Sequence, residues 1–140
     1  MRIKNEQSML AFGGRVARTI IASAKKGVVV YLLGDLGAGK TTLVRGFLQS
    51  LGHKGAVKSP TYNIVEPYCI DGQQIYHFDL YRLNDAEELE YIGIRDYLNA
   101  DSICLIEWPE KGRGVLPSAD LSIQIDIKGN ERTISTSLSL

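Results

Sequence analysis

Hydrophobic residues follow several different periods along the chain, and each period predicts a different kind of element. Over residues 6–24, small and apolar residues recur every three to four positions, which predicts an amphipathic helix. Residues 28–33 and 103–106 are continuous apolar runs of the kind found in strands buried inside a sheet. The apolar stripe of the predicted helix consists of Leu10, Gly14, Ala17, Ile20 or Ile21, and Ala24.

Strict alternation of apolar and polar side chains marks the last third of the chain. Residues 121–127 alternate in this way, and Gly129-Asn130 turns the chain into a second stretch that continues through Leu138 and Leu140. The pattern predicts a half-exposed antiparallel hairpin that extends one edge of the sheet.

A second hairpin is predicted in the middle of the chain. Two extended stretches, residues 62–70 and 74–80, are punctuated by Pro60 and Pro67 and joined at Asp71-Gly72. An Asp-Gly pair between two extended stretches is a strong hairpin signal because both residues tolerate a left-handed backbone.

Short helices are predicted after that hairpin. Residues 84–90 are acidic and open a helix that Asn84 or Asp85 can cap. A further turn or helix covers residues 94–98.

The first buried run leads directly into a glycine-rich segment. Residues 34–41 match G-x-x-x-x-G-K-[ST] at every fixed position, and a helix-capable stretch follows that ends near Leu51-Gly52. A strand, a loop and a helix in this order aim backbone N–H groups at one place, which suits the phosphates of a nucleoside triphosphate. A chance match is the alternative, and the flanking elements argue against it. The residues expected to contact the nucleotide are Gly34, Asp35, Leu36, Gly37, Ala38, Gly39, Lys40, Thr41 and Thr42.

Two of these residues have more specific expected roles. Lys40 is expected to reach the β- and γ-phosphates, and the Thr41 hydroxyl is expected to hold a magnesium ion.

The second buried run, residues 103–106, ends in Glu107. Four apolar residues followed by a carboxylate form the pattern of a Walker B strand, whose acid binds the metal through water or polarises the attacking water. Asp101 stands at the wrong end of this strand for that role. Trp108 follows directly, and it either lines the nucleotide site, docks a partner or packs over a loop.

Three further segments contain candidate functional residues, and each allows two interpretations. Alternation places His77, Asp79 and Tyr81 on one face, which is either a polar site for metal, water or transition-state contacts or an exposed hairpin face. Ser59 and Thr61 form either a switch segment that senses the γ-phosphate or an ordinary turn. Residues 111–114 form a flexible basic loop that can supply a cation to the phosphates or is solvated.

Composition restricts the choice of function. The 140 residues carry 16 basic and 16 acidic side chains, so the net charge is +0 and direct, high-affinity nucleic-acid binding is not expected. The length predicts a single domain over residues 1–140 with no separate substrate domain. Cys69 and Cys104 are expected to be small buried hydrophobes in a reducing compartment. No signal peptide or membrane span is predicted, so the expected location is cytoplasmic.

Four segments together resemble one protein family. They are GDLGAGKTT at 34–42, SPTY at 59–62, HFDLYR at 77–82 and IEWPE at 106–110. In order and spacing, over nearly the whole chain, they are similar to the bacterial TsaE family (older name YjeE), the small ATPase of tRNA threonylcarbamoyladenosine biosynthesis.

The resemblance implies a fold, cofactors and site residues. The fold is an α/β P-loop NTPase-like domain with a central, mostly parallel sheet, helices on both faces and antiparallel hairpin extensions. ATP and Mg²⁺ are the implied cofactors, with Thr41 and Glu107 at the metal. Lys40, Asp79 and Glu107 are the implied catalytic residues, and Trp108 lies next to the metal acid.

The resemblance also implies partners. TsaE works with TsaD and TsaB, and TsaD carries the transfer of threonylcarbamoyl to an adenosine in the anticodon loop of tRNAs that read codons starting with A. TsaE uses ATP so that the complex turns over, and it meets tRNA only indirectly. Weak ATPase activity alone, stimulated by the partner proteins, is therefore expected.

Three other functions compete with this hypothesis. A GTP-dependent switch would need a guanine-reading Asn-Lys-x-Asp segment, and none occurs. A small-molecule kinase needs an acceptor pocket and usually a lid, for which only residues 111–114 are available. A nucleotide-binding scaffold without turnover is opposed by the carboxylates Asp79 and Glu107.

Overall fold

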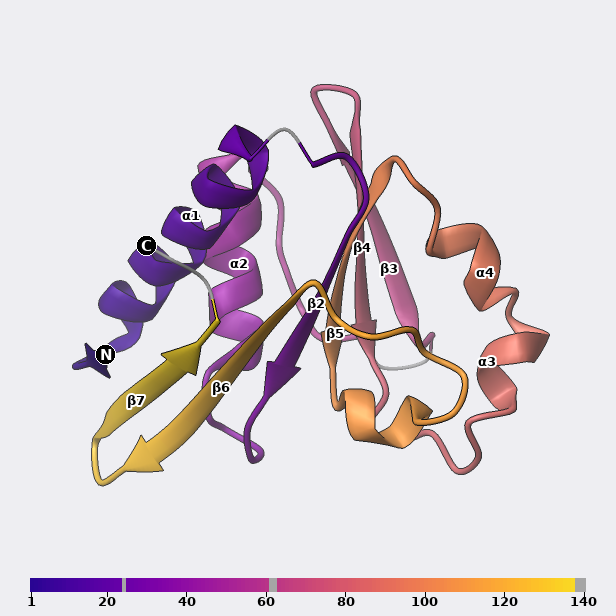
Figure 1. Cartoon of the computed structure of the whole chain (residues 1–140). Helices are drawn as coiled ribbons and strands as arrows, with labels where there is room; N and C mark the ends of the chain where they lie inside the picture. The colour runs from indigo at the N-terminus through magenta and orange to yellow at the C-terminus, as the bar shows by residue number, and fades with distance from the viewer. Residues whose placement is uncertain (24, 61–62, 138–140) are drawn as a thin grey trace.

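The computed structural model describes residues 1–23, 25–60 and 63–137, and within these ranges seven strands form one sheet. The strands are β1 (Arg2–Ile3), β2 (Val28–Leu33), β3 (Val65–Ile70), β4 (Gln73–Asp79), β5 (Ser102–Glu107), β6 (Leu121–Lys128) and β7 (Glu131–Thr136). Their order is β1-β7-β6-β2-β5-β4-β3 (Figure 1). Strands β6, β2, β5 and β4 pair in parallel, and the outer pairs are antiparallel. The predicted fold class is confirmed.

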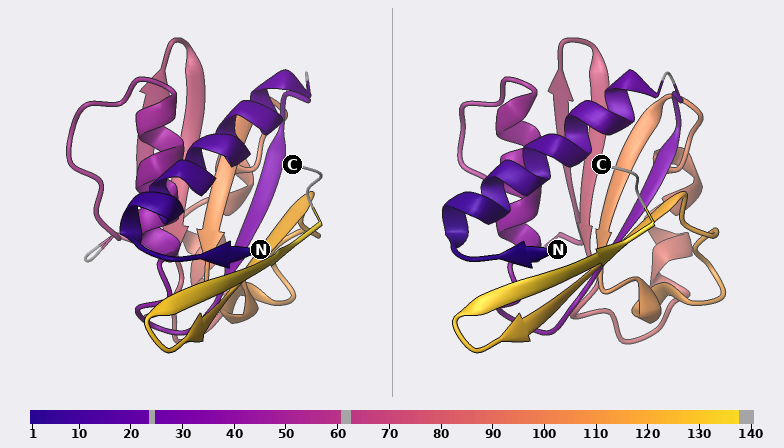
Figure 2. Two further views of the ribbon diagram at one scale, coloured as in Figure 1. Left: turned by 90° about the vertical axis from the view of Figure 1, so that its left-hand side faces the viewer. Right: turned by 60° about the vertical axis from the view of Figure 1, so that its left-hand side comes forward.

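Helices cover both faces of this sheet. The helices are α1 (Glu6–Ala22), α2 (Lys40–Ser50), α3 (Glu88–Tyr91) and α4 (Ile94–Tyr97), with a 3-10 helix η1 (Pro109–Gly112) after β5. α1 and α2 lie on one face and the shorter α3 and α4 lie on the other (Figures 1 and 2). Alternate residues of β5 belong to the two cores, with Leu105 in the first and Cys104 and Ile106 in the second. The run of apolar residues in β5 is therefore continuous because both faces are covered.

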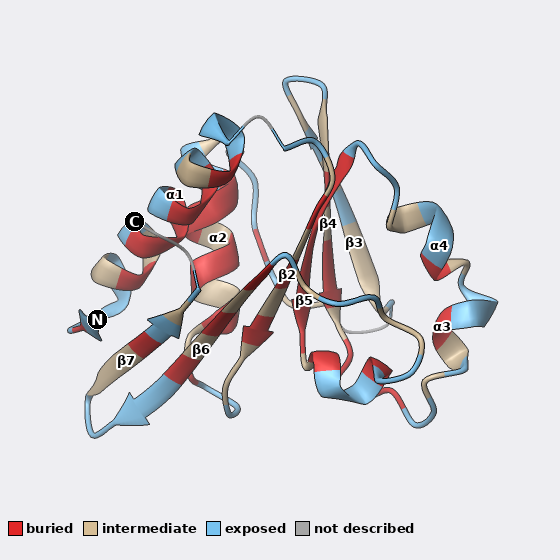
Figure 3. Ribbon diagram, viewed as in Figure 1, coloured by how far each residue is buried: buried red, intermediate tan, exposed pale blue. Residues whose placement is uncertain are grey.

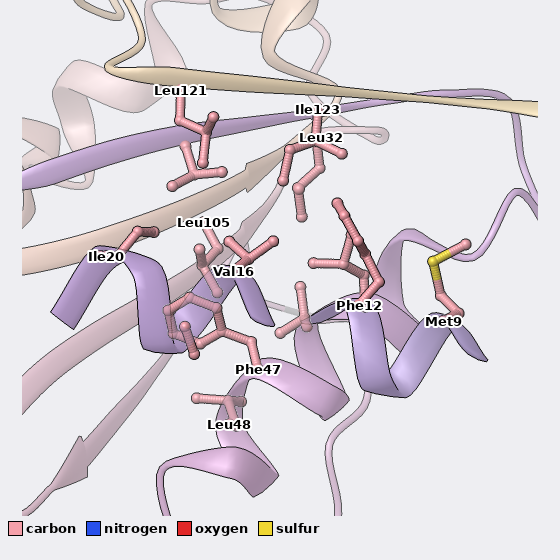
Figure 4. Packing of buried hydrophobic residues seen from close by; sticks show 14 of the residues in the cluster. Met9, Phe12, Val16, Ile20, Leu32, Phe47, Leu48, Leu105, Leu121 and Ile123 are labelled. Atoms are coloured by element: carbon pink, nitrogen blue, oxygen red, sulfur yellow. The ribbon is translucent and has the colours of Figure 1, made fainter. Parts of the chain in front are cut away.

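The larger core lies between the sheet and the helix pair. Phe12 and Val16 of α1 and Phe47 of α2 pack against Leu32 and Leu105 of the sheet (Figure 4). These side chains are no more than 1% exposed. The burial map shows the same division, with β5 buried along its length and the turn between β6 and β7 exposed (Figure 3).

Two glycines allow α1 and α2 to pack at close range. A Cβ on Gly13 would lie 2.1 Å from the carbonyl oxygen of Leu43, and a Cβ on Gly46 would lie 2.1 Å from the carbonyl oxygen of Leu10. No side chain fits at that distance, so the backbones of the two helices touch. This contact fixes the position of α2, whose N-terminus begins in the glycine-rich segment.

The predicted first helix is confirmed with adjusted details. Asn5 caps it by accepting the Ser8 N–H at 2.9 Å, and it ends at Ala22. Of the two isoleucines that the stripe left open, Ile20 is buried and Ile21 is 48% exposed. Ala24, the predicted last member of the stripe, lies outside the described residues.

The predicted turn of the middle hairpin is confirmed, but the interpretation of its second strand as exposed is not. Asp71 and Gly72 have φ of 50° and 81°, as the predicted turn requires. The first strand begins at Val65, and the predicted start at residue 62 lies outside the described residues. β4 also pairs with β5, so it is an inner strand and His77 is 0% exposed. The exposed-face interpretation of His77 is therefore wrong.

The predicted acidic helix starts later than expected. α3 begins at Glu88, because the Glu88 carboxylate accepts the N–H groups of Asn84 and Asp85 and holds the preceding residues in turns. The N-cap of α3 is Glu87 and no side chain caps the helix, so the predicted capping by Asn84 or Asp85 is wrong. Asp85 instead accepts the Glu87 N–H at 3.0 Å in the turn before the helix. The predicted element over residues 94–98 is confirmed as α4.

The C-terminal hairpin is confirmed, and the N-terminus adds a strand that its polar sequence did not predict. β6 pairs with β2 and β7 forms the next strand, while the expected continuation through Leu138 and Leu140 lies outside the described residues. β1 pairs with β7 through Arg2 with Thr133. This pairing provides hydrogen-bond partners for backbone N–H and C=O groups at the edge of β7, and it leaves no local signal in the sequence.

The two cysteines differ in exposure. Cys104 is buried on β5, as expected, but Cys69 is exposed, because β3 is the edge strand of the sheet. The prediction of a buried Cys69 is therefore wrong. Among the described residues, no helix has the length and apolar character needed to cross a membrane.

Candidate functional site

The carboxyl ends of the central parallel strands meet at the glycine-rich segment, residues 34–41, called here the phosphate-binding loop. In the sheet register Leu32 of β2 stands opposite Glu107, and Asp79 of β4 stands opposite Glu107 from the other side. The two carboxylates are therefore neighbours at the edge where the loop leaves β2 (Figure 1). Ligands of open α/β sheets bind at this kind of edge.

The backbone of the loop depends on glycine. Gly34, Gly37 and Gly39 have φ of 151°, 79° and 112°, which L side chains rarely adopt. Gly39 is the N-cap of α2 and brings no side chain to cap the first N–H groups of that helix. Unpaired N–H groups at a helix start attract an anion.

Lys40, the first residue of α2, folds back over the loop. Its Nζ donates to the Gly34 carbonyl at 2.6 Å and stands 3.8 Å from the centroid of the Trp108 ring. The side chain is only 4% exposed. Burial lowers the pKa of the Lys40 ammonium, although Glu107 and Asp79 act in the opposite direction. The cation is thus held between a carbonyl and an aromatic face beside the two acids.

Glu107 is the centre of a buried polar network. Its Oε2 accepts from the Thr41 hydroxyl at 3.1 Å and from His77 Nε2 at 2.6 Å. The Ser59 hydroxyl in turn hydrogen bonds to the Thr41 hydroxyl. Because a carboxylate only accepts, Nε2 of His77 carries the proton. Among the described residues, the buried Nδ1 of His77 has no hydrogen-bond partner.

Asp79 ends β4 beside this network. Its Oδ1 accepts the Tyr81 N–H at 3.1 Å. Burial raises the pKa of the Asp79 carboxyl above its ordinary value, the negative charge of Glu107 adds to the effect, and the Tyr81 N–H opposes it. Because β4 ends at Asp79, Tyr81 is not on the strand, contrary to the predicted alternation.

Trp108 lies in the site because the chain turns sharply after Glu107. Its φ of 57° and ψ of 50° are left-handed, which is unusual for a bulky residue and re-aims the indole toward Lys40. The Tyr81 ring packs against the indole with 5.0 Å between centroids. The indole packs over Lys40 of the phosphate-binding loop, and it also lines the hollow at that loop.

These groups surround a hollow of about 280 Å³, called here the loop hollow. It is lined by Leu36, Gly37, Ala38, Gly39, Lys40, Thr41, Thr42, Ser59, Asp79, Glu107 and Trp108. Candidate residues on four separate segments of the chain are therefore brought together around the phosphate-binding loop. Thr61 lies outside the described residues, and the contact of Ser59 with Thr41 places the other half of that segment at the loop.

The basic segment 111–114 is placed differently from the prediction. Its first two residues belong to η1, and Arg113 lines a separate hollow beside Tyr31. The interpretation as a flexible loop is therefore wrong for Lys111 and Gly112.

The oxygen atoms around Glu107 suit a hard cation. The hydroxyls of Thr41 and Ser59 and the Glu107 carboxylate lie within one hydrogen-bonded chain. In the part of the chain that the structure describes, no group of three or more His, Cys, Asp or Glu side chains forms a metal cage. Mg²⁺ is commonly held by one or two protein oxygens together with phosphate and water, so the set fits magnesium.

Sequence reasoning missed one residue of the site. Arg132 of β7 donates from Nε to the Ala38 carbonyl at 3.0 Å and from Nη2 to the Gly37 carbonyl at 3.2 Å. A single arginine in an alternating strand gives no local signal, since its contact depends on where β7 lies in the sheet.

Comparisons with other proteins agree with this geometry. The family model described as "Threonylcarbamoyl adenosine biosynthesis protein TsaE" matches residues 3–134. A Haemophilus influenzae protein named tRNA threonylcarbamoyladenosine biosynthesis protein TsaE is 60% identical over 133 residues, which cover 94% of this chain and 84% of the relative. A Bacillus subtilis protein of the same name is 40% identical over 116 residues, covering 83% and 72%. The crystal structure of Bacillus subtilis YdiB matches with a TM-score of 0.77 and 33% identity, covering 96% of this chain and 80% of that chain.

Proposed function

The chain belongs to the TsaE family, whose members are named as tRNA threonylcarbamoyladenosine biosynthesis proteins, and we propose that it binds and hydrolyses ATP with Mg²⁺ to support TsaD and TsaB. In this proposal TsaD carries the transfer of threonylcarbamoyl to the anticodon-loop adenosine, and this chain meets tRNA only through the complex with TsaD and TsaB. The net charge of +0 agrees with an indirect role.

One observation carries the proposal: Lys40, Thr41, Asp79 and Glu107 converge on the loop hollow from three segments of the chain. Phosphoryl transfer needs a phosphate cradle, a cation and a positioned carboxylate, with little covalent chemistry from the protein. The three segments lie far apart in the sequence and meet only because of the strand order. A chance convergence of these residue types is therefore improbable.

The residues divide the work by position. The phosphates are bound by the N–H groups at the start of α2 and by Lys40. To reach them, Lys40 Nζ gives up its hydrogen bond to the Gly34 carbonyl and donates to a phosphate oxygen instead. His77 and Thr41 orient Glu107. Asp79 stands beside Glu107 and orients the attacking water or takes up its proton, which a raised pKa favours. Magnesium at Thr41 and Glu107 would neutralise phosphate charge as the bond to the leaving group breaks.

Binding is tested by isothermal titration calorimetry with Mg²⁺-ATP. We expect Lys40→Ala to fold normally and to lose roughly 10- to 100-fold in affinity, because a charged donor to phosphate contributes about 1.5–3 kcal/mol. The exposed Lys111→Ala is the matched control, and its affinity should be unchanged. Unchanged affinity in a folded Lys40→Ala protein would remove the basis of the proposal.

Partner dependence is tested by steady-state ATPase assays at fixed magnesium and salt. The isolated chain should hydrolyse ATP slowly, and addition of TsaD and TsaB should accelerate it, since docking can bring Asp79 and Glu107 into register with the phosphates. A fast isolated enzyme that is indifferent to both proteins would instead favour a small-molecule kinase.

A specific contact supports a second candidate, a nucleotide-dependent switch. The Ser59 hydroxyl hydrogen bonds to the Thr41 hydroxyl, which is the group proposed to face magnesium. Nucleotide would compete for Thr41 and release the segment that carries Ser59. Limited proteolysis that cuts near residue 60 faster with ATP than without would support the switch, and equal rates would count against it.

A further inference from the structure

Arg132 reaches the phosphate-binding loop from β7, a strand none of whose described residues lines the loop hollow. Its Nε donates to the Ala38 carbonyl at 3.0 Å and its Nη2 to the Gly37 carbonyl at 3.2 Å. We propose that Arg132 is a positioning residue for phosphate binding, which fixes the backbone of the loop in its binding geometry before a nucleotide arrives. The inference rests on the proposed function and deepens it.

The geometry of the peptide bond is the first argument. Every described peptide bond is trans, so the C=O of one residue and the N–H of the next point in opposite directions. Holding the Ala38 carbonyl toward Arg132 therefore directs the Gly39 N–H to the other side, and Gly39 lines the loop hollow. Holding the Gly37 carbonyl likewise directs the Ala38 N–H away from Arg132, where it donates to the Asp35 carbonyl at 3.1 Å. Arg132 thus sets the orientation of two successive peptide planes of the loop.

The loop needs such an external contact because side-chain packing does not hold it at Gly37. Apart from its chain neighbours, no described atom would lie within 4 Å of a Cβ placed on Gly37. Gly37 and Gly39 have φ of 79° and 112°, and glycine loses more conformational freedom than any other residue when it is ordered. A loop that is ordered in advance has less entropy to lose when the phosphates bind.

Arg132 is itself held in place. Ile3 of β1 and Ile127 of β6 pair with it from the two sides of β7. Its Nη1 donates to the Glu131 carbonyl at 3.0 Å, so all three nitrogens of the guanidinium are engaged. The guanidinium is a planar fork of fixed geometry, whereas the ammonium of lysine is a single point on a flexible stem. Lysine in this place could not hold both carbonyls in the same way.

Two other roles for Arg132 lead to different expectations. If its positive charge alone attracted the phosphates, lysine would serve as well as arginine. If its side chain contacted the base or the ribose, its loss would weaken ATP binding and leave the binding of inorganic triphosphate unchanged. Positioning of the loop requires that both ligands weaken alike and that lysine does not restore them.

The experiment measures the affinities for Mg²⁺-ATP and for inorganic triphosphate with Mg²⁺ by isothermal titration calorimetry in the full chain. We expect Arg132→Ala to lose roughly 10-fold for both ligands, which is the effect of about one hydrogen bond, and Arg132→Lys to lose at least roughly 3-fold for both. Arg2→Ala is the matched control, because this exposed arginine on the neighbouring strand pairs with Glu131 at 2.8 Å. Its two affinities should equal those of the wild type.

Hydrogen exchange of the nucleotide-free protein gives a readout that does not depend on a ligand. The amides of residues 35–39 should exchange several-fold faster in Arg132→Ala and Arg132→Lys than in the wild type, because the loop opens more often without its anchor. In Arg2→Ala they should exchange at the wild-type rate. Thermal unfolding checks that each variant is folded, and Arg132→Lys carries the test if Arg132→Ala does not fold.

The outcomes separate the two proposals. Wild-type protein that binds neither ligand overturns the proposed function and the inference with it. Wild-type protein that binds ATP and no triphosphate overturns the inference alone, because the loop then does not hold phosphates by itself. The inference is also overturned by unchanged affinities in Arg132→Ala, by selective loss of ATP, by full affinity in Arg132→Lys, by an equal loss in Arg2→Ala, or by unchanged exchange of the loop amides.

Discussion

At the scale of single residues, the candidate site depends on a carboxylate whose position is set by its neighbours. Glu107 accepts from both Thr41 and His77 and is 3% exposed. A buried carboxylate with two donors has little freedom, so its charge is presented at one point. A substitution that removes the charge of Glu107 and keeps the volume of its side chain therefore tests the role of the charge.

Glu107→Gln should lower ATP turnover in the assembled complex by roughly 10²- to 10⁴-fold while Mg²⁺-ATP affinity changes much less. The amide keeps the volume, whereas the loop N–H groups hold the phosphates regardless of the acid. Turnover and affinity are measured on the same preparation, with the exposed Glu110→Gln as the control. Normal turnover in Glu107→Gln would mean that the Walker B acid is misassigned.

Asp79 links function to stability. Its raised pKa means that the folded state binds this proton more tightly than the unfolded state does. The contribution of this proton to the free energy of unfolding is therefore fully present below the unfolded-state pKa of about 3.9. It is lost as the pH rises through the folded-state pKa of Asp79. At neutral pH the nucleotide-free protein buries a carboxylate at a cost.

Asp79→Asn should raise the Tm of the nucleotide-free chain by a few degrees at pH 7 and abolish most hydrolysis. The Asn oxygen can still accept the Tyr81 N–H, so the loop after β4 is kept. Thermal unfolding from pH 3.5 to 7.5 measures the effect. The gain should vanish toward pH 3.5, and a gain that is constant over the range would contradict a titrating Asp79.

At the scale of elements, the position of the phosphate-binding loop depends on how closely α1 and α2 pack. Gly46→Ala should lower the free energy of unfolding by about 2–3 kcal/mol, because its Cβ would lie 2.1 Å from the Leu10 carbonyl oxygen. Gly14→Ala is the matched control in the partner helix. Its Cβ would lie 3.2 Å from the flexible end of Arg18, so it should change stability by less than about 1 kcal/mol.

Urea denaturation of both variants measures the difference. Equal effects of the two substitutions would show that the helices can separate without cost. A lower ATP affinity is also expected in folded Gly46→Ala protein, because the N–H groups at the start of α2 are proposed to bind the phosphates.

At the scale of the whole molecule, the two cysteines report on the sheet. Cys69 is exposed on edge strand β3, whereas Cys104 lies on β5 and burial raises the pKa of its thiol to about 11. Native protein at pH 8 should therefore react rapidly with one equivalent of a thiol reagent. The second thiol should react only through opening of the sheet, and rapidly in denaturant.

Cys69→Ser is the control, which should leave only the slow thiol. Rapid reaction of two thiols in native protein would contradict the burial of β5. Because β5 also carries Glu107, slow reaction of Cys104 measures the integrity of the strand that presents the acid.

Much of this protein is determined by the sequence itself. The phosphate-binding loop, the buried runs of β2 and β5, and the turn at Asp71-Gly72 are all local patterns. Each is readable because glycine conformations, side-chain periods and the strand–loop–helix order act over a few neighbouring residues. The resemblance to the TsaE family rests on the four motifs at residues 34–42, 59–62, 77–82 and 106–110.

Only the tertiary structure decided which residues meet. β4 was expected as a hairpin strand, and its pairing with β5 is what buries His77 against Glu107 and places Asp79 opposite it. The contact of Arg132 with the loop and the exposure of Cys69 likewise follow from the places of β7 and β3 in the strand order. Strand order arises from pairing between distant segments, and no local period of side chains encodes it.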